Sequence, residues 1–210
     1  MNLADMRTIV RRELKDEDAD NYRWTNDEMD RHIARAVKEF SEAIPYEQKV
    51  TKATTANSRE LDISSLSDRV MVAVVEYPVG EFPMRYQRFS LWGDTLTLLG
   101  SDVPDGSNAC IYYSKLHTLA VSSSTIPAEF EELVALGAGG YAAYEWAAYA
   151  TNRVNAGGSD TTGEFLKWGR DKLEQFRAAL RRLGRRNRVR AGSLYRPYYP
   201  AVSQTTDYGP

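Results

Sequence analysis

The sequence has few of the residues on which metal binding and covalent cross-linking depend. Its 210 residues include one cysteine, Cys110, and two histidines, His32 and His117. A single cysteine cannot form an internal disulfide, and so few thiol and imidazole groups almost exclude a metal cluster built from them. We therefore expect an intracellular assembly site and no cofactor. Because nothing basic lies beside Cys110 in the sequence, we interpret it as a small buried hydrophobe, and both histidines as boundary residues without a catalytic role.

Long apolar runs are also missing. No stretch approaches the roughly 20 consecutive apolar residues that a membrane-spanning helix needs. The first five residues, Met1-Asn2-Leu3-Ala4-Asp5, contain neither the basic nor the apolar part of a signal peptide. With 42% hydrophobic and 27% charged residues, the chain is typical of a soluble globular protein with one sizeable core or two small ones. We expect no contact with a membrane.

Motifs of known enzymes are absent as well. The glycines at 137, 139 and 140 lack the strand-glycine-helix context of a phosphate-binding loop, and no Gly-x-Ser-x-Gly elbow occurs. No reaction class emerges from the sequence, so we predict no catalytic residue and a protein that is not an enzyme.

One acidic loop approximates a calcium-binding motif. Asp16, Asp18 and Asp20, with Asp27 at the twelfth position, follow the ligand spacing of an EF-hand loop. However, Asn21 replaces the glycine of that loop, and Asp27 replaces its longer glutamate. A solvated acidic loop is the favoured interpretation, and a metal at Asp16, Asp18 and Asp20 is the alternative.

Apolar residues at helical spacing predict four helices near the two ends of the chain. The first spans about residues 2–15, and the second begins at a capping box formed by Thr25 and Glu28 and closes before Pro45. The third spans about residues 128–150, and the fourth ends at Gly184. Small residues fill the third helix, which predicts a second helix packed closely against it.

The middle of the chain has the pattern of strands. Residues 70–75 are apolar at successive positions, which predicts a strand covered on both faces. Gly93-Asp94 lies between two strand-like runs and predicts a two-residue hairpin turn. A change of parity between Tyr86 and Phe89 indicates a bulge. Together with a strand at 109–115 and strands near Val50 and Leu61, these runs indicate a small antiparallel meander.

These elements define an α+β fold in three parts. Residues 1–47 and 125–184 are predicted to form a four-helix bundle. Residues 48–124 form an inserted small antiparallel β-sheet, and residues 185–210 form an extended C-terminal arm.

The arm is chemically distinct from the rest of the chain. It contains five arginines and one aspartate and carries a net charge of +4, whereas residues 1–184 carry −6. Arginine and tyrosine give much of the contact energy at protein interfaces, so we expect the arm to lie on a partner. The candidate partner-binding residues are Arg185, Arg186, Arg188, Arg190, Tyr195, Arg196, Tyr198 and Tyr199.

The N-terminal stretch resembles that of a known family. The segments from Leu3 to Leu14, Asp16 to Asp18, Tyr22 to Asp30 and Phe40 to Pro45 are similar to the opening of the head-to-tail adaptor (connector or head completion) proteins of tailed bacteriophages. The resemblance covers about a fifth of the chain. It implies a virion structural protein of the neck, assembled in the host cytoplasm as an oligomeric ring, commonly a dodecamer of twelve copies, beneath the portal protein.

Two functions are compatible with the arm. In the first, which the resemblance implies, it docks on the portal while the ring connects to a downstream neck or tail protein and leaves a channel through which DNA passes without sequence-specific binding. In the second, the arginines neutralise phosphates and the tyrosines stack on bases of a nucleic acid. The net negative charge of residues 1–184 favours assembly with proteins over DNA binding. A tail without a fixed partner is the third interpretation.

Overall fold

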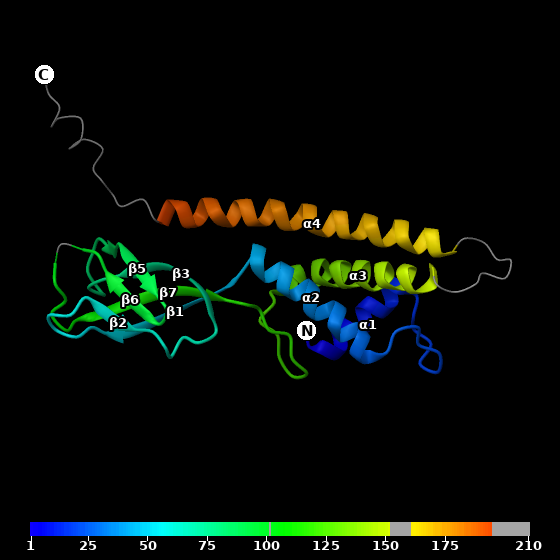
Figure 1. The fold of residues 1–210 in the computed structure, drawn as a ribbon, viewed down its shortest axis with the longest axis horizontal. Helices are drawn as coiled ribbons and strands as arrows, with labels where there is room; N and C mark the ends of the chain where they lie inside the picture. The colour runs from blue at the N-terminus through cyan, green and yellow to red at the C-terminus, as the bar shows by residue number, and fades with distance from the viewer. Residues whose placement is uncertain (101, 152–160, 195–210) are drawn as a thin grey trace, which may run out of the picture. The chain divides into compact units, whose positions relative to one another are not determined.

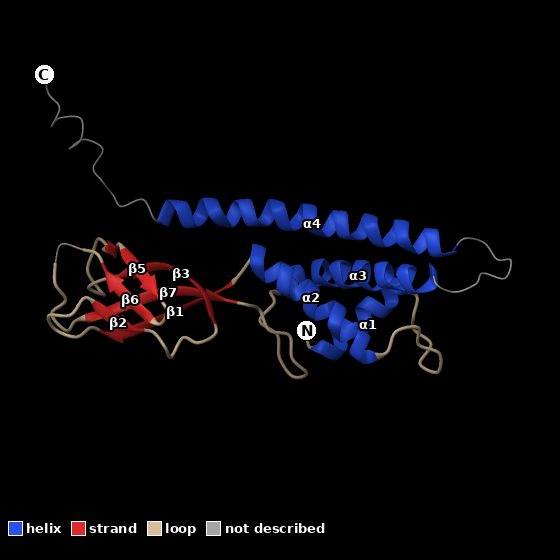
Figure 2. Cartoon of the chain, in the orientation of Figure 1, coloured by secondary structure: helices blue, strands red, loops and turns tan. Residues whose placement is uncertain are grey.

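The protein divides into two compact units. The structure is a computed structural model and describes residues 1–100, 102–151 and 161–194. One unit comprises Met1–Tyr46 and Leu116–Arg185 and is called the helical unit, and the other is built on Glu47–Lys115 and is called the β unit. Helices and strands are therefore segregated (Figure 2), so the predicted mixture of helix and antiparallel sheet is confirmed.

The first two helices begin at caps that the sequence specifies. Helix α1 spans Leu3–Leu14 behind a capping box formed by Asn2 and Asp5. Helix α2 spans Asn26–Ala43 and begins at the predicted capping box, in which the Thr25 hydroxyl accepts from the Glu28 amide and the Glu28 carboxylate accepts from the Thr25 amide. It ends before Pro45, whose ring disfavours helical geometry in the residue ahead of it.

The third and fourth helices pack closely on each other. A short 3-10 turn, η1 (Ala128–Phe130), leads into α3 (Glu131–Thr151). A Cβ added at Gly140 would lie 3.3 Å from the Gly169 carbonyl oxygen of α4, and one at Gly137 would lie 2.8 Å from the Phe176 ring. The small residues of α3 therefore have the close helical neighbour that the sequence predicts. Figure 1 shows α3 with α4 on one side and α1 and α2 on the other.

Helix α4 spans Thr161–Leu194, which corrects the predicted end at Gly184. The backbone of residues 185–194 is helical and not extended. Gly184 does not end the helix because glycine inside a helix costs only about 1 kcal/mol, and the arginines and alanine that follow are good helix formers. The prolines that would stop the helix come only at 197 and 200, and residues 195–210 lie outside the described part of the chain.

The four helices share one hydrophobic core. Met6, Phe40, Val134 and Phe176, one from each helix, are fully buried in it. Residues 116–124, predicted as part of the insertion, also contact the helices of this unit, because the His117 amide donates to the Ser41 hydroxyl at 2.9 Å and the Leu3 amide donates to the Ala120 carbonyl at 3.0 Å.

The β unit contains two small sheets around a second core. The strands are β1 (Tyr46–Ala53), β2 (Glu60–Asp62), β3 (Arg69–Glu76), β4 (Tyr86–Gln87), β5 (Phe89–Trp92), β6 (Thr95–Leu98) and β7 (Asn108–Lys115). Their order is β1-β7-β3-β4 in one sheet and β2-β6-β5 in the other. Non-sequential neighbours such as β1 and β7 show that the arrangement is not the simple meander predicted. Both sheets bury side chains in one cluster, among them Leu96 and Ile111.

The hairpin between β5 and β6 is confirmed. Trp92 pairs with Thr95, and Gly93 has a φ of +56°, a left-handed conformation that glycine adopts without strain. The parity change between Tyr86 and Phe89 has a different cause from the predicted bulge. At Arg88 the chain leaves the first sheet, where β4 pairs with β3, and enters the second, where β5 pairs with β6.

Strand β3 differs from its prediction in burial. Val74 and Val75 are buried, but Val70 and Met71 are 60% and 53% exposed. The pairing of β3 with β7 shifts register between Arg69 and Met71 and again before Val74. Because each irregularity turns side chains toward the other face, the first half of this apolar run is not covered on both sides.

Candidate interaction surfaces

The predicted arginine cluster lies on the last turns of α4. Arg181, Arg182, Arg185 and Arg186 are exposed there. Their spacing of four residues places Arg181 near Arg185 and Arg182 near Arg186 on the helix surface. Like charges at this spacing destabilise a helix by about 0.2–0.5 kcal/mol per pair. An anionic partner that neutralises these rows would remove that repulsion, so the rows suit an acidic surface or a phosphate backbone.

The other predicted partner-binding residues can be placed only in part. Arg188 and Arg190 belong to the helical backbone of α4. Tyr195, Arg196, Tyr198 and Tyr199 lie outside the described residues. The assignment of these residues to a partner stays a prediction.

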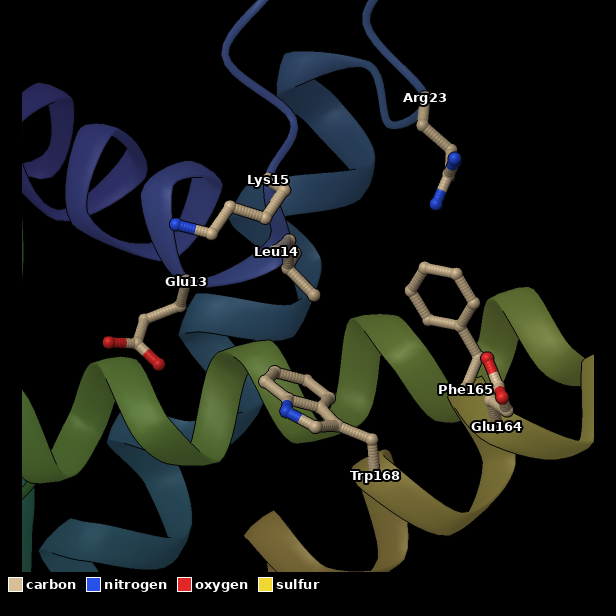
Figure 3. Close-up of a pocket in the computed structure, with 7 residues that line it drawn as sticks. All are labelled: Glu13, Leu14, Lys15, Arg23, Glu164, Phe165 and Trp168. Carbon is tan, nitrogen blue, oxygen red and sulfur yellow. The ribbon is translucent and has the colours of Figure 1, made fainter. Parts of the chain in front are cut away.

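An aromatic groove lies between the ends of α1 and α4 (Figure 3). Its volume is about 400 Å³, and Phe165 and Trp168 of α4 face Leu14 across it. The Arg23 guanidinium carbon lies 4.9 Å from the centroids of both Trp146 and Phe165. Cations over aromatic faces are held by the ring quadrupole. The remaining lining residues are Glu13, Lys15 and Glu164.

A second groove, the α2-side groove, runs between α2, α3 and α4 and measures about 410 Å³. The Arg35 guanidinium carbon lies 4.0 Å above the centroid of the Tyr141 ring. The Tyr141 hydroxyl donates to Glu39 and accepts from the Arg177 guanidinium at 3.2 Å. Burial, together with the bond to Glu39, raises the pKa of Tyr141 and keeps it protonated. Tyr144, Arg170, Leu173 and Glu174 complete the groove.

A third groove, the α1-side groove, lies between α1, α3 and α4 and measures about 540 Å³. Its floor is apolar, with Ile9, Leu133 and Leu136 half-buried. The Lys172 ammonium lies 3.3 Å from the Glu13 carboxylate. Arg12, Glu132 and Ala135 complete the groove. Sequence periodicity did not reveal any of these three grooves, because each one is formed by helices that are distant in the sequence.

The acidic loop serves a structural role at Asp16. The Asp16 carboxylate forms an ion pair with Arg11 and accepts a hydrogen bond from the Arg23 amide at 2.6 Å. The Arg11 guanidinium also donates to the Trp24 carbonyl at 2.9 Å. Asp16 therefore joins α1 to the start of α2. Among the residues that the structure describes, no group of three or more His, Cys, Asp or Glu side chains could hold a metal ion.

Both histidines are more buried than predicted. His32 is 4% exposed and His117 is 7% exposed, so neither is a boundary residue. The Nε2 atom of His32 lies 3.3 Å from the Glu145 carboxylate, within ion-pair distance but without hydrogen-bond geometry. The Nδ1 atom of His117 lies 2.9 Å from the Thr125 carbonyl oxygen. Burial lowers the pKa of both imidazoles, and Cys110 is buried and free as predicted.

Among the described helices, none is both long enough and apolar enough to cross a membrane. The surface instead presents arginine rows, cations stacked on rings and grooves between helices, which are typical of sites that bind proteins or nucleic acids. The fold and these surfaces define a binding protein with a helical unit and an inserted β unit.

The family follows from comparison with known proteins. Residues 1–200 match the family described as SU10 adaptor protein. The chain therefore belongs to this family of phage head-to-tail adaptors, and the resemblance found in the N-terminal stretch is confirmed. Membership implies a structural, non-enzymatic role in the virion neck and interaction with portal and tail proteins. No curated protein matches the chain closely enough to be counted as a relative.

Proposed function

We propose that the protein is a subunit of the neck ring that binds the portal through residues 185–210 and connects it to the next neck or tail component. The ring, with an expected twelve copies, assembles in the host cytoplasm and leaves a channel for DNA. In this proposal the helical bundle of residues 1–47 and 125–184 contacts neighbouring subunits, and the insertion of residues 48–124 receives the next component.

The end of α4 carries the proposal. Its exposed arginines extend past the core, because Leu180 is the last buried apolar residue of this helix among those whose burial is described, up to Arg186. A helix that continues beyond the residues it needs for packing suits a docking element. Arginine forks match carboxylates in a bidentate manner, so an acidic groove of the portal is the favoured binding site.

The β unit has exposed aromatic residues that suit the next component. Phe82 is 99% exposed and Trp92 is 88% exposed. Large aromatic side chains are enriched at the energetic centres of protein interfaces. We therefore assign the surface of the insertion around Phe82 and Trp92 to the contact with the downstream neck or tail protein.

The rival function is nucleic-acid binding by the same arginines. The arginine rows of α4 would neutralise phosphates in that case, and binding would weaken steeply with salt. The net charge of −6 on residues 1–184 opposes it, because a DNA-binding domain ordinarily presents a basic face.

Co-sedimentation with portal rings and with DNA at moderate salt separates the two functions. The full chain is compared with a chain ending at Gly184 and one ending at Leu194. We expect the full chain to bind portal rings. The chain ending at Gly184 should lose this binding while retaining its helical circular dichroism. The chain ending at Leu194 should keep the portion of the portal binding that the helical residues 185–194 contribute. Normal portal binding by the shortest chain would refute the docking role, and tight, salt-sensitive DNA binding without portal binding would establish the rival function.

A further inference from the structure

We propose that the α2-side groove of one copy binds the α1-side groove of the next copy, so that the ring is built from these two surfaces of the helical unit. The inference rests on the proposed ring and adds the faces and residues that form the contact between subunits.

The two grooves lie on opposite sides of the α3 and α4 pair. On α4, Arg170 lines one groove and Lys172 lines the other, and two positions correspond to about 200° around a helix. On α3, Tyr141 lines the α2-side groove and Leu136 the α1-side groove, five positions apart, which is about 140°. A subunit with two different surfaces on opposite sides can contact a neighbour on each side.

Such an arrangement is what a ring requires. A contact between two unlike surfaces is heterologous, and repeated around a rotation axis it closes into a ring. A contact of one surface with itself would stop at a dimer. Opposite placement of the two grooves therefore favours a cyclic assembly of this chain over a two-fold dimer.

The charges that remain unpaired in the two grooves are complementary. Among the described residues, Arg170 and Glu174 of the α2-side groove are exposed and make no ion pair. In the α1-side groove Glu132 is exposed and makes no ion pair among the described residues. Lys172 lines the same groove, but it is already paired with Glu13. Bringing the grooves together places Arg170 against Glu132.

A second ion pair would join Arg12 of the α1-side groove to Glu174 of the α2-side groove, so that here the positive charge comes from the α1-side groove. The side chain of Arg12 is 67% exposed, and its nearest acid, Glu17, lies at 3.8 Å with little burial. Such a loose surface pair contributes little to stability, so Arg12 is free to turn to Glu174 of the next copy. Two ion pairs of opposite direction fix the orientation of the contact between the two grooves, because reversing one groove would bring Arg170 to Arg12 and Glu174 to Glu132.

The apolar parts of the grooves also match. Tyr144 is 48% exposed at the α2-side groove, although it is a large aromatic side chain. The half-buried side chains of Ile9, Leu133 and Leu136 give the α1-side groove an apolar floor. A tyrosine ring covering such a floor buries apolar surface at the centre of the contact and leaves its hydroxyl at the polar rim.

Charge reversal tests the pairing. We compare Arg170→Glu, Glu132→Lys and the chain that carries both changes, and measure oligomers by analytical ultracentrifugation with and without portal rings. Each single change should lower self-association at least tenfold because it places like charges face to face. The double change should restore it, because the pair is rebuilt with reversed sign. Asp171→Lys is the matched control: it changes the charge as Glu132→Lys does, at an exposed position of α4 outside both grooves, and should leave association unchanged.

Cysteine cross-linking gives a second readout. In a Cys110→Ala background, Tyr144→Cys together with Leu136→Cys should give a ladder of cross-linked oligomers, whereas either cysteine alone should give none. Cross-linked dimers from one cysteine alone would show a self-paired contact and overturn the inference, as would single reversals that leave the ring intact. If the wild-type chain binds portal rings but never associates with itself, the inference fails while portal docking stands. Loss of portal binding by the single reversals, with self-association intact, would likewise overturn it.

Discussion

Arg11 and Arg12 are neighbours on α1 but differ in burial, and burial decides how much each one contributes to the free energy of unfolding. The side chains of Arg11 and its partner Asp16 are 6% and 5% exposed, whereas the side chain of Arg12 is 67% exposed. Removing one member of a buried pair leaves an uncompensated charge away from water. Removing a surface arginine leaves its partner hydrated.

We expect Arg11→Ala to lower the free energy of unfolding by about 3–5 kcal/mol, since Asp16 then stays buried without a cation. Arg12→Ala, the matched control one residue away, should change it by less than about 1 kcal/mol. Urea unfolding followed by circular dichroism measures both values. Equal losses in the two variants would show that burial of the Arg11 and Asp16 pair does not set the cost.

The two buried histidines make the stability of the helical unit depend on pH. Burial disfavours the charged imidazole and lowers the pKa of His32 and His117 below the ordinary 6.5. Around His32, Glu145 and Glu28 oppose this shift, while Arg31 and Arg35 add to it. A lowered pKa in the folded state means that the unfolded chain binds protons more readily, so stability rises with pH in this window.

The free energy of unfolding should therefore be highest above the ordinary histidine pKa and should fall as the pH drops below about 6.5 toward the folded-state values. His32→Gln removes one titrating group and should flatten the dependence, with His117 responsible for the remainder. Urea titrations at pH values between about 7.5 and 5.5, above the carboxylate range, test this. A slope that is unchanged in the variant would exclude His32 as a source.

At the scale of elements, the contact between α3 and α4 depends on the absence of side chains. A Cβ added at Gly169 would lie 3.1 Å from both the Gly140 carbonyl oxygen and the Tyr144 amide nitrogen. Backbone atoms cannot rotate away as a side chain can, so the helices would have to separate. By contrast, a Cβ at Gly184 would meet Ala43 at ordinary contact distances of 3.7 Å and more.

Gly169→Ala should destabilise the protein by about 1–3 kcal/mol, because overpacking outweighs the better helix propensity of alanine. Gly184→Ala in the same helix should stabilise it by up to about 1 kcal/mol, because only the propensity changes. Thermal unfolding of both variants provides the comparison. A stabilised Gly169→Ala variant would mean that the two helices are not in close contact.

At the scale of the whole molecule, the chain has two separate cores. Among the described residues, the core of the helical unit contains residues from Met6 to Leu180 but none between 47 and 115, and the core of the β unit lies between Leu61 and Ile111. The two chain segments that enter and leave the β unit lie close together, since the rings of Tyr46 and His117 are 5.6 Å apart.

Replacing residues 47–115 by a short Gly-Ser linker should therefore leave a folded helical unit, because no residue of its core is removed. We expect strongly helical circular dichroism and a single cooperative transition in urea. A chain that binds a hydrophobic dye and unfolds without cooperativity would show that the helical unit needs the insertion to fold.

The starts of the helices, the hairpin and the resemblance to the family could be predicted from the sequence, because each depends on residues that lie close together in the chain. The capping box at Thr25 and Glu28 and the glycine of the hairpin at Gly93 act within a few residues. The end of α4 was missed because Gly184 has a modest local cost that the residues after it outweigh. The exposure of Val70 and Met71 was missed because it depends on register shifts against β7, which the pattern of one strand cannot reveal.

Local features of the chain were enough to predict the α+β class, the arginine-rich C-terminal segment and the adaptor family, because composition, periodicity and caps are properties of neighbouring residues. Packing between distant elements determines which charges are buried, such as Arg11 with Asp16, and which stay exposed without an ion pair among the described residues, such as Arg170 and Glu132. The grooves where those charges lie are formed by α1, α2 and α3 with α4, across more than a hundred residues of chain. Helical spacing fixes the face on which a residue lies, but only packing between distant elements fixes which neighbour that face meets.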